Sequence, residues 1–132
     1  MWEVYMNNLP CERIKQLFLN RRLFSAEYKL LIQVQNNGIK LTHEQLERLS
    51  LLEQYESCIQ AWLSSLPEDE AYAVQRHLID GIDWPRIATE YNAKWGNENA
   101  KTDRTLMSYQ KKALLKIANS FDHIPLVLMN EM

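Results

Sequence analysis

The chain has 132 residues and a net charge of −2; 46% of its residues are hydrophobic and 24% are charged. These values are ordinary for one folded domain, or for one domain with a helical extension, and they exclude a disordered or fibrous chain. The charge is uneven, since residues 84–121 hold seven basic and three acidic side chains, a balance of +4 that leaves −6 elsewhere. A basic surface can therefore exist in a chain that is acidic overall.

Helices should dominate, because only three Gly and four Pro interrupt the chain, and we predict an all-α fold. A first helix is predicted from near Pro10, which suits a first helical turn, to about Gln35, with Gly38 as its stop.

A second helix is predicted to follow and to run to about residue 64. Thr42 and Gln45 have capping-box spacing, and Leu41 with Leu46 would form a hydrophobic staple. The two helices should form an antiparallel pair over residues 1–64. Their apolar surface exceeds what two helices can cover, which predicts packing on the C-terminal domain or dimerisation.

Three shorter helices are predicted over residues 65–121, followed by a tail over 122–132. Ser65 and Glu68 have capping-box spacing for the first, which should reach about Asp80. Asp83 should cap the second, which extends to about residue 95, and Thr102 the third. The acidic cluster over 68–70 is explained by the dipole of a helix N-terminus.

Signals for catalysis, metals and membranes are missing from the sequence. Cys11 and Cys58 lie far apart, so we interpret both as buried thiols, and His43, His77 and His123 are scattered without ligand spacing. No nucleophile constellation or phosphate-binding loop occurs. We therefore expect no enzyme, metal or cofactor, and, with no apolar run of about 18 residues, a cytoplasmic protein without a membrane partner.

The last predicted helix has the composition of a recognition helix. Leu106, Ala113 and Ile117 define its buried stripe, while Trp84 and Trp95 are expected in the core. Arg, Ser and Thr can bond to base edges, and Lys neutralises phosphates. The candidate DNA-binding residues are Lys101, Thr102, Asp103, Arg104, Thr105, Ser108, Lys111 and Lys112.

A family resemblance accompanies this pattern. It is carried by Leu66-Pro67, by Gly81-Ile82-Asp83-Trp84 before Ile87-Ala88, and by Thr105-Leu106 followed by Lys112-Ala113-Leu114 and Ile117. The segment from Leu63 to Phe121 resembles region four of bacterial sigma factors and the related regulators of phages and prophages. The resemblance implies a three-helix helix-turn-helix domain in which residues 102–112 read promoter DNA.

Two departures from that family shape the expected function. The stretch from Tyr91 to Lys101 is longer than the usual unit, and no region two is present for melting DNA. The resemblance therefore implies a stand-alone transcription regulator, similar to the late-gene regulators of Gram-positive phages. Its expected partners are double-stranded DNA, RNA polymerase and a second copy of the chain.

Two other functions remain open at this point. One is a helix-turn-helix protein of phage DNA packaging, resembling a small terminase subunit, which ring-like oligomers would favour. The other is a helical adaptor that binds a protein and has no affinity for DNA.

Overall fold

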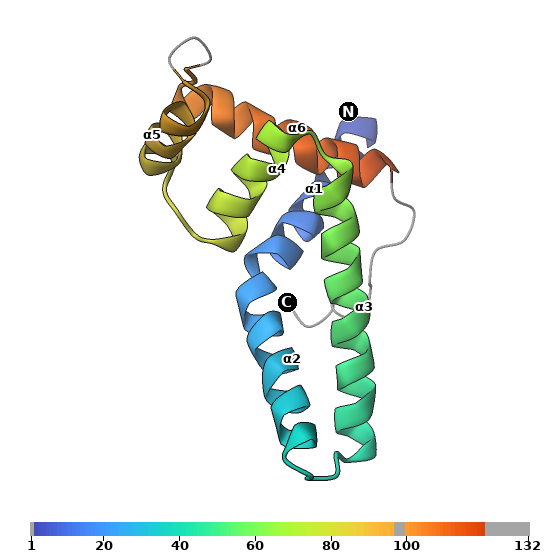
Figure 1. Cartoon of the computed structure of the whole chain (residues 1–132). Helices are drawn as coiled ribbons and strands as arrows, with labels where there is room; N and C mark the ends of the chain where they lie inside the picture. Colours follow the sequence, from blue (N-terminus) through green and yellow to red (C-terminus); the bar gives the residue numbers. More distant parts are fainter. Residues whose placement is uncertain (1, 97–99, 121–132) are drawn as a thin grey trace.

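The structure is a computed structural model that describes residues 2–96 and 100–120, and over these residues every regular element is helical. The predicted all-α class is confirmed. Figure 1 shows a hairpin, formed by α2 and α3, below a group formed by α4, α5 and α6, which α1 joins. The elements are α1 (Trp2–Leu19), α2 (Arg21–Asn36), α3 (His43–Ser65), α4 (Glu68–Val74), the π-helical turn η1 (Gln75–Ile79), α5 (Trp84–Trp95) and α6 (Asp103–Ser120).

The single first helix predicted between Pro10 and Gln35 is wrong, because the chain forms two helices there. Helix α1 already begins at Trp2, and the chain turns at Asn20 (φ −88°, ψ 3°) before α2. The Gln16 carbonyl at the end of α1 accepts from both the Asn20 N–H at 3.0 Å and the Asn20 side-chain amide at 2.9 Å. This turn separates the directions of α1 and α2, so that α1 can reach α6 (Figure 1).

The loop between α2 and α3 follows its local signals closely. The Gly38 N–H donates to the Gln35 carbonyl, and the Ile39 N–H donates to the Val34 carbonyl, with φ of Gly38 at +82°. This is the Schellman ending that favours Gly. The predicted capping box is confirmed, since Thr42 Oγ1 accepts from the Gln45 N–H and Gln45 Oε1 accepts from the Thr42 N–H.

Helices α2 and α3 run antiparallel, so the hairpin contains only the part of the predicted first helix that follows Asn20. Arg21, at the start of α2, pairs with Glu56 near the end of α3, whereas Glu27 pairs with Arg48 at 2.6 Å. Tyr55 of α3 is buried and donates to the carbonyl oxygen of Leu17 in α1. Leu46, predicted to form a staple with Leu41, is 44% exposed, whereas Leu41 is buried.

The main apolar core joins both halves of the chain. It contains Ile14, Leu17 and Phe18 of α1, residues of the hairpin, and Ala113, Leu114 and Ile117 of α6. Packing on the C-terminal segment, one of the two outcomes expected for the apolar surface of the first helices, is thus observed. The core continues across the boundary drawn between residues 64 and 65, while the predicted tail over 122–132 lies outside the described residues.

Helix α4 does not begin with the predicted capping box. Ser65 still belongs to α3, where its hydroxyl donates a 2.7 Å hydrogen bond to the Trp62 carbonyl. Pro67 is the residue before α4, and no side chain caps it. The helical stretch then ends before Gly81 as predicted, but its last turn is π-helical, with the Asp80 N–H bonded to the Gln75 carbonyl.

A second, smaller apolar cluster supports α5 and α6. Its buried members are Ile87, Ala88, Tyr91 and Leu106. Trp84 and Trp95, expected in the core, pack against this cluster while remaining partly exposed. The predicted cap of α5 is confirmed, because Asp83 Oδ1 accepts from the Arg86 N–H at 3.2 Å.

The two cysteines are free thiols, as expected, but both are only partly buried. Burial raises the pKa of Cys58 to about 11, so this side chain is a neutral thiol at neutral pH. Among the described helices, none has the length and apolar character needed to cross a membrane.

Candidate nucleic-acid interface

Helix α6 has the two faces that its sequence predicts. Leu106, Ala113 and Ile117 are at most 1% exposed. The predicted DNA-binding residues lie outside this stripe. Thr102, Arg104, Ser108, Lys111 and Lys112 are exposed, and Lys101, Asp103 and Thr105 are half-buried.

The exposed residues divide into two groups with different geometry. Arg104 is followed by Ser108, Lys111 and Lys112 after four, seven and eight residues, which places these four side chains on one face. Thr102 is used as the cap of α6, since its Oγ1 accepts from the Thr105 N–H at 3.3 Å and lies 3.1 Å from Thr105 Oγ1. Both threonine hydroxyls are therefore engaged at the helix start, whereas the side chains of Arg104 and Ser108 have no bond to another described residue.

The basic side chains of residues 84–121 are also of two kinds. Three have partners: Arg86 lies 3.4 Å from Glu90, Lys94 lies over the ring of Trp95 at 4.5 Å, and Lys116 binds Glu70 at 2.6 Å. The other four form no ion pair with a described residue, namely Lys101, Arg104, Lys111 and Lys112. The unpaired cations are thus the ones predicted to contact DNA.

Glu70 corrects one detail of the sequence interpretation. The sequence predicts that it serves, with its neighbours, the dipole of a helix N-terminus, but Glu70 is 7% exposed and is directed toward α6, where it binds Lys116. Its second oxygen, Oε1, is buried without a hydrogen-bond partner among the described residues. The pair fixes α4 against α6 rather than serving only the end of α4.

The start of α6 is held by one side chain of α5. Asn92 Nδ2 donates to the Lys101 carbonyl at 3.1 Å, and Asn92 Oδ1 accepts from the Lys101 N–H at 2.7 Å. These two bonds satisfy both backbone groups of Lys101 and set where α6 begins relative to α5. The sequence contains one weak signal for this role, since Asn is a poor residue for a helix interior.

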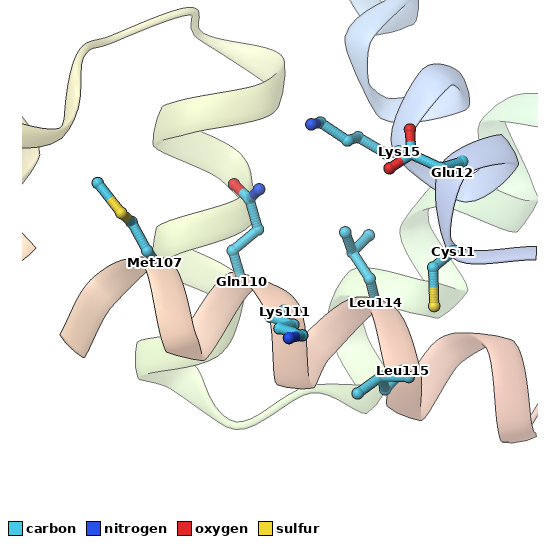
Figure 2. A pocket seen from close by; sticks show the side chains of 8 residues that line it. All are labelled: Cys11, Glu12, Lys15, Met107, Gln110, Lys111, Leu114 and Leu115. Carbon is cyan, nitrogen blue, oxygen red and sulfur yellow. The ribbon is translucent and has the colours of Figure 1, made fainter. Parts of the chain in front are cut away.

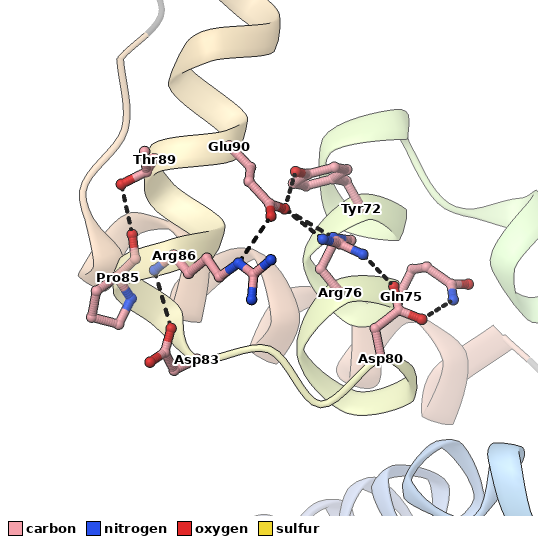
Figure 3. Close-up of polar contacts among 9 residues, drawn as sticks. All are labelled: Tyr72, Gln75, Arg76, Asp80, Asp83, Pro85, Arg86, Thr89 and Glu90. Carbon is pink, nitrogen blue, oxygen red and sulfur yellow. Dashed lines mark hydrogen bonds and ion pairs between the residues drawn. The ribbon is translucent and has the colours of Figure 1, made fainter.

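Helix α5 is fixed in turn by a polar network with α4 and η1 (Figure 3). Arg76 donates to Glu90 Oε2 through Nη2 at 2.6 Å and through Nε at 3.1 Å, and it donates to Asp80 at 2.9 Å through Nη1. The hydrogen bonds from Arg76 lower the pKa of Glu90, and they raise the pKa of Arg76 itself. Both groups are therefore charged at neutral pH, and the network joins α5 to η1.

A histidine connects the π-helical turn to α5 and α6. The His77 ring stacks on Trp84 with its centroid 4.0 Å away and an interplanar angle of 23°. His77 Nδ1 lies 2.6 Å from Oε1 of the buried Gln110. The sequence placed His77 among scattered histidines, and spacing alone could not reveal this contact, because Gln110 is 33 residues away.

Helix α1 lies beside α6 and borders a groove of about 380 Å³ (Figure 2). Lys15 contributes a half-buried cation to the groove, Lys111 of α6 contributes another, and Glu12 contributes an acidic group. The residues that line it are Cys11, Glu12, Lys15, Met107, Gln110, Lys111, Leu114 and Leu115. The first helix thus belongs to the surroundings of the candidate interface, which its distance in sequence from α6 did not indicate.

Within residues 2–96 and 100–120, no three His, Cys, Asp or Glu side chains are placed to hold a metal ion. Comparison with known proteins gives no further assignment: no protein-family model, curated protein or solved structure matches the chain.

Proposed function

We propose that the protein is a sequence-specific DNA-binding transcription regulator whose helix α6 enters the major groove. The observation that carries the proposal is the row of unpaired cations on the exposed face of a helix that is held by α5. An α-helix with its side chains is about 10–12 Å wide, which matches a major groove about 12 Å wide. Unpaired cations can neutralise phosphates without first breaking an internal ion pair.

The side chains have distinct roles in this proposal. Arg104 and Ser108 face outward and are the base readers, because an Arg can bond to two acceptors of a guanine. Lys101, Lys111 and Lys112 neutralise phosphates on either side. Thr105, which the sequence also favours as a base reader, has its hydroxyl at the cap and supports the helix start together with Thr102. The resemblance to sigma region four adds promoter DNA as the target and RNA polymerase as a further partner.

Arg104→Ala tests the assignment of the base reader. The variant should bind its best genomic fragment about 5- to 150-fold more weakly, equivalent to about 1–3 kcal/mol, while its affinity for random DNA changes much less. Lys40→Ala is the matched control, because Lys40 is exposed in the loop between α2 and α3, away from α6 (Figure 1). Fluorescence anisotropy with both fragments gives the comparison. An equal loss on specific and random DNA would instead assign Arg104 to the backbone.

A further inference from the structure

A second groove, the hairpin groove, lies where α2 and α3 meet the π-helical turn η1. It has a volume of about 440 Å³. The residues that line it are Arg21, Arg22, Ser25, Ala26, Lys29, Gln60, Leu63, Gln75 and Ile79. Three of these described residues are basic and none of them is acidic. The hairpin groove is therefore cationic, although the whole chain has a net charge of −2.

Two of the three cations in the hairpin groove are not compensated. Arg21 is held by Glu56 of α3, and 17% of its side chain is exposed. Its guanidinium has five N–H donors, so donors remain after this pairing. Arg22 and Lys29 are exposed and form no ion pair with a described residue. The groove thus combines one fixed cation with two that are available to a ligand.

The carboxylates that contact lining residues do not cancel this excess of positive charge. Gln75 donates to Asp80 at 3.1 Å, but Asp80 is itself paired with Arg76 at 2.9 Å. Glu56 is the partner of Arg21. Each of these carboxylates is matched by an arginine, so the two exposed cations of α2 stay in excess.

The start of α2 has charges of the sign that a helix N-terminus disfavours. Arg21 and Arg22 are its first two residues, and its first turn contains no acidic residue. The positive end of a helix dipole favours anions and is unfavourable for cations. The Asn20 side chain does not cap α2, because it donates back to the Gln16 carbonyl. An anion bound beside Arg22 would offset this repulsion.

A neutral donor lies between the two exposed cations. Arg22, Ser25 and Lys29 follow at intervals of three and four residues, which places them on one face of α2. The Ser25 hydroxyl is half-buried and makes no hydrogen bond to a described residue. Gln60 of α3 adds an amide group to the same groove. Cationic donors and neutral donors on one lining suit an anion with several acceptor oxygens.

We infer that the hairpin groove binds a small ligand that carries a phosphate group. Phosphate oxygens accept charge-assisted hydrogen bonds from arginine and lysine, and an arginine can bind two of them at once. The volume of about 440 Å³ lies within the range of about 300–1,000 Å³ that is usual for small-molecule sites. No residue of α6 is among those that line the groove. The inference therefore does not require that the protein bind DNA.

The first test is isothermal titration calorimetry of the full chain with pyrophosphate at low salt. The wild type should bind it, and Arg22→Ala combined with Lys29→Ala should weaken binding at least about 10-fold, because two charged contacts are lost. Arg13→Ala with Lys40→Ala is the matched control, since it removes two exposed cations outside the groove and gives the same net charge. Circular dichroism checks that each variant keeps its helices. Absence of binding by the wild type, or an equal loss in the control, would overturn the inference.

The second test separates a small phosphate ligand from the phosphates of nucleic acid. Affinity for a random DNA duplex at low salt is measured by fluorescence anisotropy with the same two double variants. Both variants lose the same charge, so their affinities for DNA should agree within about twofold. A larger loss of DNA affinity in the Arg22→Ala, Lys29→Ala variant would assign the two cations to a nucleic-acid backbone and overturn the inference.

Discussion

Replacing the Tyr55 hydroxyl tests how the hairpin is joined to α1. Tyr55 is 1% exposed and donates to the carbonyl oxygen of Leu17, which is likewise buried near the end of α1. In Tyr55→Phe the ring still fits, but the carbonyl loses its partner in a place that water does not reach. The expected loss of unfolding free energy is about 1–3 kcal/mol. At about 3 °C per kcal/mol for a chain of this length, the melting temperature should fall by roughly 3–9 °C.

The same hydroxyl predicts a dependence on alkaline pH. Burial raises the pKa of Tyr55 well above its ordinary value of 10.0, so the fold favours the neutral phenol. That stabilisation is complete below pH 10 and is lost as the pH rises toward the folded-state pKa, with a slope of about 1.4 kcal/mol per pH unit. Tyr55→Phe should remove this contribution. Burial also raises the pKa of Tyr72 and of Tyr91, so the unfolding free energy of the variant should still depend on alkaline pH, but less strongly.

The assay for both effects is urea unfolding followed by circular dichroism between pH 7 and pH 11. Tyr28→Phe is the matched control, because Tyr28 lies on the same hairpin and its hydroxyl makes no bond to a described residue. It should change the unfolding free energy by less than about 0.5 kcal/mol. If Tyr55→Phe were as stable as the wild type at pH 7, the hydrogen bond would not contribute as argued.

Three further substitutions probe the support of α6. Asn92→Ala removes both hydrogen bonds to Lys101 and should lower the free energy of unfolding in urea by about 1 kcal/mol. It should also weaken DNA binding several-fold. An unchanged affinity for DNA would contradict the role of Asn92 in positioning α6. Lys116→Met leaves Glu70 buried without its cation and should lower the free energy of unfolding by about 1–3 kcal/mol. Adding Glu70→Met should restore much of this loss. Equal stability of the single and double variants would refute the pairing of Glu70 with Lys116. Glu90→Gln tests the stability of the fold in acid. Arg76 lowers the pKa of Glu90 from 4.5, so the ionised Glu90 stabilises the fold above pH 4.5. This stabilisation is lost as the pH falls through the lower pKa that Glu90 has in the folded protein. The unfolding free energy of the variant, measured as the pH is lowered, should not show this loss. A pH dependence equal to that of the wild type would contradict the role of the Arg76–Glu90 pair.

Local signals explain what the sequence predicted well. The caps at Thr42, Asp83 and Thr102 and the helix end at Gly38 depend on side chains within a few residues, and all four are present. The buried stripe of α6 was predicted from helical periodicity for the same reason. These features fix the position of the candidate interface along the chain.

Long-range contacts explain what the sequence did not predict. The contact of α1 with α6 joins helices that are far apart in the sequence, and the burial of Glu70 depends on Lys116, which is 46 residues away. The Ser65 hydroxyl, which a capping box would use as an acceptor, instead donates to the Trp62 carbonyl, a partner that capping-box spacing does not consider. The groove between α1 and α6 likewise has no signature in either helix alone.

Salt dependence of DNA binding tests the proposed function most directly. Binding to fragments of the protein's own genomic neighbourhood is measured against random competitor between 50 and 200 mM salt. We expect the protein to prefer one fragment, with an affinity that falls as salt rises. Because each phosphate contact contributes about 0.9 to the slope of log K against log salt, Lys111→Ala with Lys112→Ala should reduce that slope by about 1.8. Absence of binding at low salt, or an unchanged slope in the double variant, would contradict α6 as the DNA-binding helix.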